Sequence, residues 1–139
     1  QKELSSTDIR NRTQEALFMV GLAGVEKKMP SDLSGGMRKR AALARLIVYK
    51  PQILLYDEPT TGLDPTTARQ IDQLINQIKQ GLSATSIVVT HDIRSALEVG
   101  DRLAFHEDGR IQKIASKSDF VKIEDSDIKK FFKNADIHF

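Results

Sequence analysis

The sequence predicts an α/β fold in which parallel strands are flanked by helices. Two apolar runs, residues 53–56 and 86–90, lack the polar alternation of half-exposed strands and are typical of strands covered on both faces. Between them, residues 65–80 repeat apolar side chains at helical spacing, which indicates a helix packed on a sheet, with Gly81 at its end. A strand, a helix and a strand in this order imply a right-handed parallel crossover, so we expect both strands in one sheet.

Length and composition indicate an ordinary globular protein. The 139 residues suit one domain, with 40% apolar and 29% charged side chains. No apolar stretch approaches the ~20 residues that span a bilayer, and the polar start QKELSSTDIRNR is no secretory signal. The absence of cysteine excludes disulfides and thiolate metal sites and fits the cytoplasm. A net charge of +2 is too small to indicate a nucleic-acid partner.

The first predicted helix covers residues 7–21, with Gly21 at its end. Its expected apolar face consists of Ile9, Thr13, Ala16, Leu17 and Val20. Phe18, Met19 and Leu22 are either core residues or a surface for a partner.

A glycine pair opens the next predicted helix. Ser34, Gly35 and Gly36 precede apolar residues at helical spacing, which are Met37, Ala41, Ala44 and Val48. Residues with almost no side chain would therefore present the free amides of the first turn, and such a helix end attracts phosphate. The alternative for Ser34 is a plain serine cap on a core helix. We expect the helix to close at Lys50 and Pro51.

Two carboxylates follow the first predicted strand. Asp57 and Glu58 come directly after residues 53–56, at the strand end where open α/β sheets bind ligands. One carboxylate at this place can hold a hard cation such as Mg²⁺. A second can orient or deprotonate an attacking water. Asp57 suits the first task and Glu58 the second.

Two further polar residues, Asp64 and His91, are candidates for the site. Asp64, followed by Pro65, is a good helix start, so capping is the plain interpretation of this carboxylate. His91 follows the second strand, and the carboxyl ends of parallel strands meet at one edge. We therefore expect His91 beside Glu58, where an imidazole would face a terminal phosphate.

The remaining chain predicts a short helix, a hairpin and a helical tail. Asp92 can cap a helix that Gly100 ends. Residues 102–106 and 110–115 read as strands around an Asp-Gly turn. The tail from Ser118 onward carries scattered apolar residues, and it docks either on its own domain or on a second copy.

Four motifs in order make the chain resemble the ATP-binding subunit of ABC transporters. LSGGM at residues 33–37 resembles the signature motif of that family, and ILLYDE at residues 53–58 resembles its Walker B strand with the catalytic glutamate. GLDP at residues 62–65 is similar to its D-loop, and VVTHD to its switch histidine. The usual signature ends in Gln where this chain has Met37, which leaves the backbone as the phosphate cradle.

The resemblance implies ATP and Mg²⁺ as ligands, and a homodimer that sandwiches two nucleotides. In that arrangement Ser34, Gly35, Gly36, Met37 and Asp64 contact nucleotide or the dimer interface, Asp57 holds Mg²⁺, and Glu58 and His91 are catalytic. The chain would be part of a P-loop NTPase domain. Residues 1–50 would end the helical subdomain, residues 51–115 would belong to the RecA-like core with its small hairpin, and residues 116–139 would form a helical tail.

The same resemblance predicts that ATP binding needs sequence motifs that these 139 residues do not contain. The sequence contains no GxxxxGK[ST] loop to bind the β and γ phosphates, and no glutamine loop. We therefore expect a carboxyl-terminal half that, as an isolated polypeptide, has negligible ATP affinity and no turnover. Because strands would lack neighbours, we also expect exposed apolar surface and self-association.

The expected setting is the cytoplasm, at the inner face of the cell membrane, on transmembrane permease subunits. Residues 28–65 and 98–111 most resemble the Mla and Mce type ATPases, which transport phospholipid between membranes. Amino-acid importers and other ABC importers are the alternative. A DNA-repair or translation ATPase and a non-catalytic dimerisation module are the two remaining classes.

Overall fold

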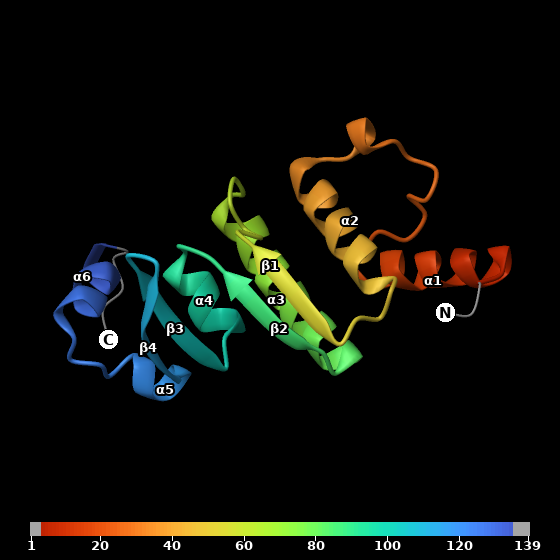
Figure 1. Ribbon diagram of the computed structural model, residues 1–139. Helices are drawn as coiled ribbons and strands as arrows, with labels where there is room; N and C mark the ends of the chain where they lie inside the picture. The colour runs from red at the N-terminus through yellow and green to blue at the C-terminus, as the bar shows by residue number, and fades with distance from the viewer. Residues whose placement is uncertain (1–3, 135–139) are drawn as a thin grey trace.

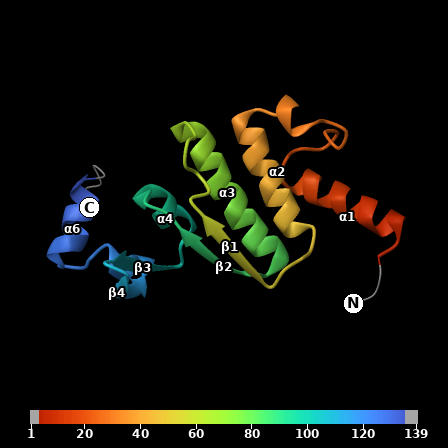
Figure 2. The same ribbon diagram turned by 45° about the horizontal axis from the view of Figure 1, so that its top comes forward.

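The computed structural model describes residues 4–134, which form a row of packed elements. Helices α1 and α2 lie at one end, strands β1 and β2 with helix α3 lie in the middle, and a hairpin with helix α6 lies at the other end (Figure 1). The same order is visible after a turn of the molecule (Figure 2). Among the described residues, no helix is long and apolar enough to cross a membrane.

The first end is built from helix α1 (Ser6–Met19), the 3-10 turn η1 (Pro30–Asp32) and helix α2 (Gly35–Ile47). A capping box between Ser5 and Asp8 starts α1. The predicted apolar face is only half right, because Ala16 and Val20 are buried while Ile9 is exposed. Of the residues that could be either core or partner surface, Leu22 is buried in the core and Phe18 is 74% exposed.

The middle layer confirms the parallel crossover. Strand β1 (Ile53–Asp57) pairs in parallel with β2 (Thr85–Val89), in a register that joins Asp57 to Val89. Helix α3 (Pro65–Leu82) covers one face of this pair. The predicted stripe is buried there, namely Ile71, Leu74, Ile75 and Ile78, and it packs with Leu54 and Tyr56. The helix runs through Gly81 to Leu82, and Ser83, whose φ of 49° is left-handed, caps its end.

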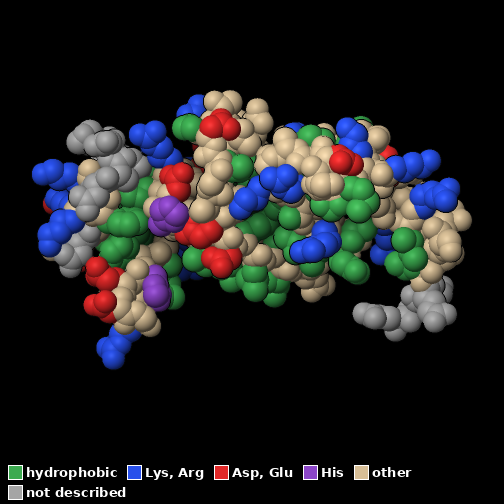
Figure 3. Space-filling model, turned by 90° about the horizontal axis from the view of Figure 1, so that it is seen from above, with side chains coloured by type: hydrophobic (Ala, Val, Ile, Leu, Met, Phe, Trp, Pro, Cys, Tyr) green, Lys and Arg blue, Asp and Glu red, His purple; other side chains and the backbone are tan. Residues whose placement is uncertain are grey.

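The opposite face of the two strands is open, so the described chain covers these strands on one face only. Ile53, Leu55, Ile87 and Val89 are 63%, 67%, 54% and 58% exposed, and they alternate with buried positions in β1 and half-buried positions in β2. The physical reason is that helix α3 supplies a cover for one face only. Exposed apolar surface was expected, and hydrophobic side chains gather along one margin of the space-filling view (Figure 3).

The other end has a second core. Helix α4 (Ile93–Val99) leads into the antiparallel hairpin of β3 (Arg102–Glu107) and β4 (Arg110–Ser116), followed by α5 (Lys117–Phe120) and α6 (Ser126–Asn134). Asp108 and Gly109 both have positive φ, as the predicted hairpin turn requires. Ile93, Phe120, Ile128 and Phe132 form the core. The described part of the tail therefore docks on its own chain.

Candidate functional site

The site lies at the carboxyl ends of β1 and β2. Asp57 ends β1 with an exposed side chain, and Glu58 follows in a left-handed conformation with φ of 46°. The Glu58 N–H donates to the Val89 carbonyl at 2.9 Å, which continues the parallel ladder by one residue. The sheet thus fixes the backbone of Glu58, while the unusual φ turns the chain away from the strand direction.

Glu58 and His91 meet as the sequence predicts. Glu58 Oε1 accepts the backbone N–H of His91 at 2.9 Å and contacts the ring Nδ1 at 2.9 Å. Glu58 Oε2 accepts the hydroxyl of Thr61 at 2.8 Å. The His91 side chain is 74% exposed and that of Glu58 is 32% exposed. The carboxylate is therefore held from both sides, and the imidazole keeps most of its surface open.

These contacts shift both protonation equilibria. Burial on its own raises the pKa of Glu58, but hydrogen bonds from the His91 ring, the Thr61 hydroxyl and the His91 N–H outweigh it, so the pKa is lowered. The hydrogen bond with Glu58 and then its negative charge raise the pKa of His91, and Asp92 adds to the rise. A carboxylate that stays ionised beside an imidazole can accept a proton from water.

Asp57 is the candidate metal ligand. The described residues contain no group of three His, Cys, Asp or Glu side chains that would enclose a metal ion. One exposed carboxylate fits Mg²⁺, because this ion keeps several waters and takes its remaining oxygens from substrate phosphates. The donor set at this edge therefore suits a nucleotide-bound Mg²⁺.

Helix α2 begins with the cap that was the alternative for Ser34. The Ser34 side chain accepts the N–H of Met37 at 3.2 Å, and its carbonyl accepts the N–H of Arg38 at 2.9 Å. Within the described residues, no bond occupies the N–H groups of Gly35 and Gly36. The cap and the predicted cradle are thus compatible.

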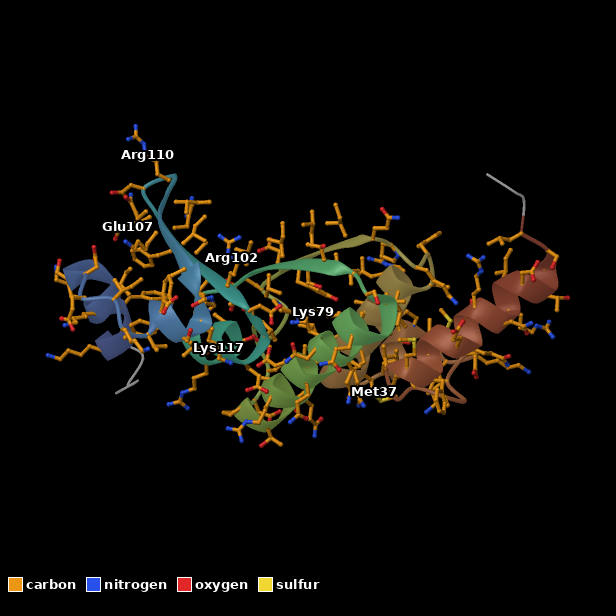
Figure 4. The ribbon with its side chains drawn as sticks, turned by 90° about the horizontal axis from the view of Figure 1, so that it is seen from below. Met37, Lys79, Arg102, Glu107, Arg110 and Lys117 are labelled. Atoms are coloured by element: carbon orange, nitrogen blue, oxygen red, sulfur yellow. The ribbon has the colours of Figure 1, made fainter. Side chains whose placement is uncertain are left out.

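The two glycines differ in the space around them. A Cβ on Gly35 would meet no atom within 4 Å, whereas a Cβ on Gly36 would lie 3.0 Å from the Thr67 methyl group. Met37 is half-buried and packs against the core that helices α1, α2 and α3 share with β1, where α2 runs beside α3 (Figure 4). Its amide is the one that Ser34 occupies, so Gly35 and Gly36 provide the open part of the helix end.

Asp64 is a helix cap, as its plain interpretation predicts. Its Oδ1 accepts the N–H groups of Thr66 and Thr67 at 3.1 and 3.0 Å, and its Oδ2 accepts the Thr67 hydroxyl at 2.6 Å. The Thr67 hydrogen bonds, from hydroxyl and then backbone, lower the pKa of Asp64. The cap holds the start of α3 beside Gly36, through their shared neighbour Thr67.

Comparisons with known proteins agree with this geometry. The family model described as ABC transporter matches residues 1–61. The probable ribonucleotide transport ATP-binding protein mkl of Mycobacterium tuberculosis is 50% identical over 97 residues, which are 70% of this chain and 27% of that protein. The dimeric post-hydrolysis structure of the ATP-binding cassette MJ0796, bound to ADP and Pi, superposes with a TM-score of 0.71. The fold is that of part of an ABC-type ATPase cassette.

The match to the cassette is partial in length. The superposition covers 84% of this chain and 50% of the solved one, at 34% identity. The spermidine/putrescine import ATP-binding protein PotA of Malacoplasma penetrans is 38% identical over 122 residues, which are 88% of this chain and 20% of that protein. The chain therefore spans about a fifth to a quarter of the length of these two relatives.

Sequence reasoning missed one contact at the site and one buried contact between helices α3 and α4. Lys39 on α2 donates from Nζ to the Glu58 carbonyl at 3.4 Å. Asp72 is buried on α3 and accepts the Ser95 hydroxyl at 2.5 Å. An acidic residue beside Ile71 in a buried stripe was the available signal for Asp72, since such a group needs a partner. No signal in the sequence identified Lys39.

Proposed function

We propose that this chain is the part of an ABC transporter ATPase that lends glycine amides to one nucleotide and a Glu–His pair to another. The contact between Glu58 and His91, beside Asp57, is the single observation that carries the proposal. It joins the ends of two neighbouring strands into one polar site. The chemistry of that site is the hydrolysis of ATP.

Each side chain has a role that follows from its place. Bound MgATP supplies the electrophilic γ phosphorus. Asp57 would hold the Mg²⁺ through water, Glu58 would orient and deprotonate the water that displaces ADP from the γ phosphorus, and His91 would contact the γ phosphate through its exposed ring. Thr61 keeps the second oxygen of Glu58 in place.

The second copy completes each site. Ser34, Gly35 and Gly36 of one copy face the nucleotide of the other, Met37 shapes the helix end, and Asp64 lies at the interface. The dimeric cassette bound to ADP and Pi supports this arrangement. The division into residues 1–50, 51–115 and 116–139 belongs to the same proposal, with the first part on permease subunits at the inner face of the membrane.

Phospholipid is the proposed cargo, on the resemblance to Mla and Mce type ATPases. The relatives' names point to other substrates, with a ribonucleotide transporter and a polyamine importer among them. Reconstitution with its permease in vesicles tests this, since labelled phospholipid should move at the expense of ATP. Transport of a small solute in place of lipid would assign the chain to the alternative importers.

The decisive test of the activity uses Glu58→Gln. In a form extended at its amino terminus by a segment with a GxxxxGK[ST] loop, this change should reduce turnover by about a hundredfold to ten-thousandfold. Nucleotide affinity should stay within about twofold, because the side-chain amide of Gln has the shape of the Glu58 carboxylate but cannot deprotonate water. Glu107→Gln, on the exposed hairpin, is the matched control with unchanged turnover.

The polypeptide of 139 residues is expected to show negligible ATP affinity by itself, because it carries no phosphate-binding loop. Turnover by Glu58→Gln at the control rate would contradict the proposal. An extended form that dimerises without hydrolysing ATP would favour the non-catalytic dimerisation module.

A further inference from the structure

Helix α3 carries a row of polar residues that faces helix α4. Asp72 accepts the Ser95 hydroxyl, the Asn76 side chain donates to the Glu98 carbonyl at 3.2 Å, and Lys79 donates to the Val99 carbonyl at 3.4 Å. The spacing of 72, 76 and 79 places the three on one helix face. Lys79 also pairs with Asp101 at 3.0 Å, and Figure 4 shows it on α3 with Arg102 and Lys117 on neighbouring elements.

The first contact of this row is buried, unlike the other two. Asp72 is 5% exposed and Ser95 is 1% exposed, and their oxygens lie 2.5 Å apart. A carboxylate in such a place is costly, and a hydroxyl donor reduces that cost. Apolar residues would have sufficed to pack a helix of seven residues on its neighbour. The polar pair instead sets one position of α4 along α3, since a hydrogen bond is directional.

From Ser95 the contacts continue to His91. The Ser95 N–H donates to Asp92 Oδ1 at 3.3 Å, and the Asp92 N–H donates to the Thr90 hydroxyl at 3.0 Å. His91 stands between Thr90 and Asp92, so both of its neighbours are fixed. Its own N–H then reaches Glu58 at 2.9 Å. Each link joins to the next, from the buried Asp72 to the exposed imidazole.

We propose that Asp72 is a positioning residue for His91, which it places on Glu58 by fixing Ser95 in the first turn of helix α4. That the placed pair acts in hydrolysis rests on the proposed function. The placement itself does not, because it is a property of the chain without nucleotide. Asp72 touches neither His91 nor Glu58 and acts through helix α4.

The titration of His91 reports its placement. Glu58 on one side and Asp92 on the other are the charged groups that raise the pKa of this ring. Ser95→Ala removes the donor without changing any charge, and Asp72→Ala removes the acceptor. Asp72→Asn keeps an oxygen acceptor and removes the charge. Asn76→Ala breaks the next contact of the row and is the control at a site remote from the first turn.

The experiment follows the His91 ring by NMR against pH, with its signal assigned from His91→Gln, in variants checked for folding by circular dichroism. Ser95→Ala and Asp72→Ala should return the pKa toward the ordinary value of 6.5, while Asp72→Asn and Asn76→Ala keep it raised. Exchange of the His91 amide with solvent should accelerate about tenfold in the first two. If Asp72→Ala does not fold, Ser95→Ala decides.

A raised His91 pKa in a folded Ser95→Ala variant would overturn the inference, as would an equal fall in Asp72→Asn and Asp72→Ala. In the extended form, Ser95→Ala should lower kcat about tenfold to a hundredfold with little change in KM. A protein that hydrolyses no ATP but shows the expected titration would refute the proposed function and leave the placement standing.

Discussion

At the scale of single residues, one carboxylate oxygen of Glu58 contacts both the backbone N–H and the ring Nδ1 of His91. Because the backbone N–H of His91 donates to Glu58 independently of the ring, the carboxylate still accepts this hydrogen bond when the imidazole is neutral. Thr61 supplies another donor at the second oxygen. Glu58 therefore remains an ionised acceptor over a wide range of pH.

The pair makes stability depend on pH in a predictable direction. The native pKa of His91 is raised, so its contribution is complete below 6.5 and is lost as the pH rises through the native pKa. The native pKa of Glu58 is lowered, so its contribution is complete above 4.5 and is lost as the pH falls through the native pKa. The pair thus stabilises the fold most between these two values.

We predict that His91→Gln lowers the urea midpoint more at about pH 5.5 than at about pH 8.5, relative to the unchanged protein. Unfolding curves at the two pH values measure this. His106→Gln, an exposed histidine on the hairpin, serves as the control. Equal losses for His91→Gln at both values would show that the pair carries no charge interaction.

Single residues also show how far sequence reasoning could reach at the site. The spacing of motifs placed His91 at the edge with Glu58, because the ends of parallel strands must meet. The motif spacing could not show that Asp72 contacts Ser95, since this contact depends on the position of helix α4 along helix α3. Side chains of helices joined by a strand and a turn have no fixed register in the sequence.

At the scale of elements, helix α3 packs against two different neighbours with two of its faces. Its apolar stripe packs on Leu54 and Tyr56 of the sheet, and its polar row meets α4. The stripe was predictable from the 3.6-residue period alone. The helix end was not, because Gly81 continues the helix and the left-handed Ser83 stops it.

The covered side of the sheet, where helix α3 packs, and its open side should respond differently to an Ile→Ala substitution. Ile78→Ala removes a side chain of 0% exposure and should cost about 2–5 kcal/mol of unfolding free energy. Ile53→Ala is the matched control at an exposed position, with an expected change within about 0.5 kcal/mol. Urea unfolding of both variants measures the difference. A large loss for Ile53→Ala would mean that this sheet face is covered in solution.

At the scale of the whole molecule, residues 4–134 hold two cores and an open apolar surface on the sheet. Helices α1, α2 and α3 share the first core with β1, and the hairpin, α4 and the tail share the second. The sequence pattern of residues 53–56 and 86–90 predicts cover on both faces, while the described chain covers one. Hydropathy shows that a strand suits burial but not which segment buries it.

This surface should make the 139-residue polypeptide associate. We predict binding of an apolar dye and elution that depends on protein concentration. Leu55→Lys should weaken both, because Leu55 lies opposite Ile87 on the open face. Ile111→Lys, at an exposed position of the hairpin, is the control with no effect. A monodisperse monomer with little dye binding would contradict the expectation.

The claim that phosphate chemistry is divided between two copies has a direct test. Gly35→Asp places a negative side chain at the open end of α2, where an added Cβ meets no atom, so the fold should persist. In the extended form, Gly35→Asp and Glu58→Gln should each abolish hydrolysis alone. A mixed dimer of the two variants would keep one site intact, with Glu58 from one copy and Gly35 from the other.

The measurement is the ATPase rate of the two extended variants, separately and after mixing in equal amounts under conditions that exchange subunits. Sites divided between two copies should give inactive variants that recover up to about a quarter of the unchanged rate on mixing, because half of the dimers are mixed and each has one intact site of two. No recovery, with exchange of subunits verified, would mean that Gly35 and Glu58 serve the same nucleotide within one copy and would contradict the division between copies.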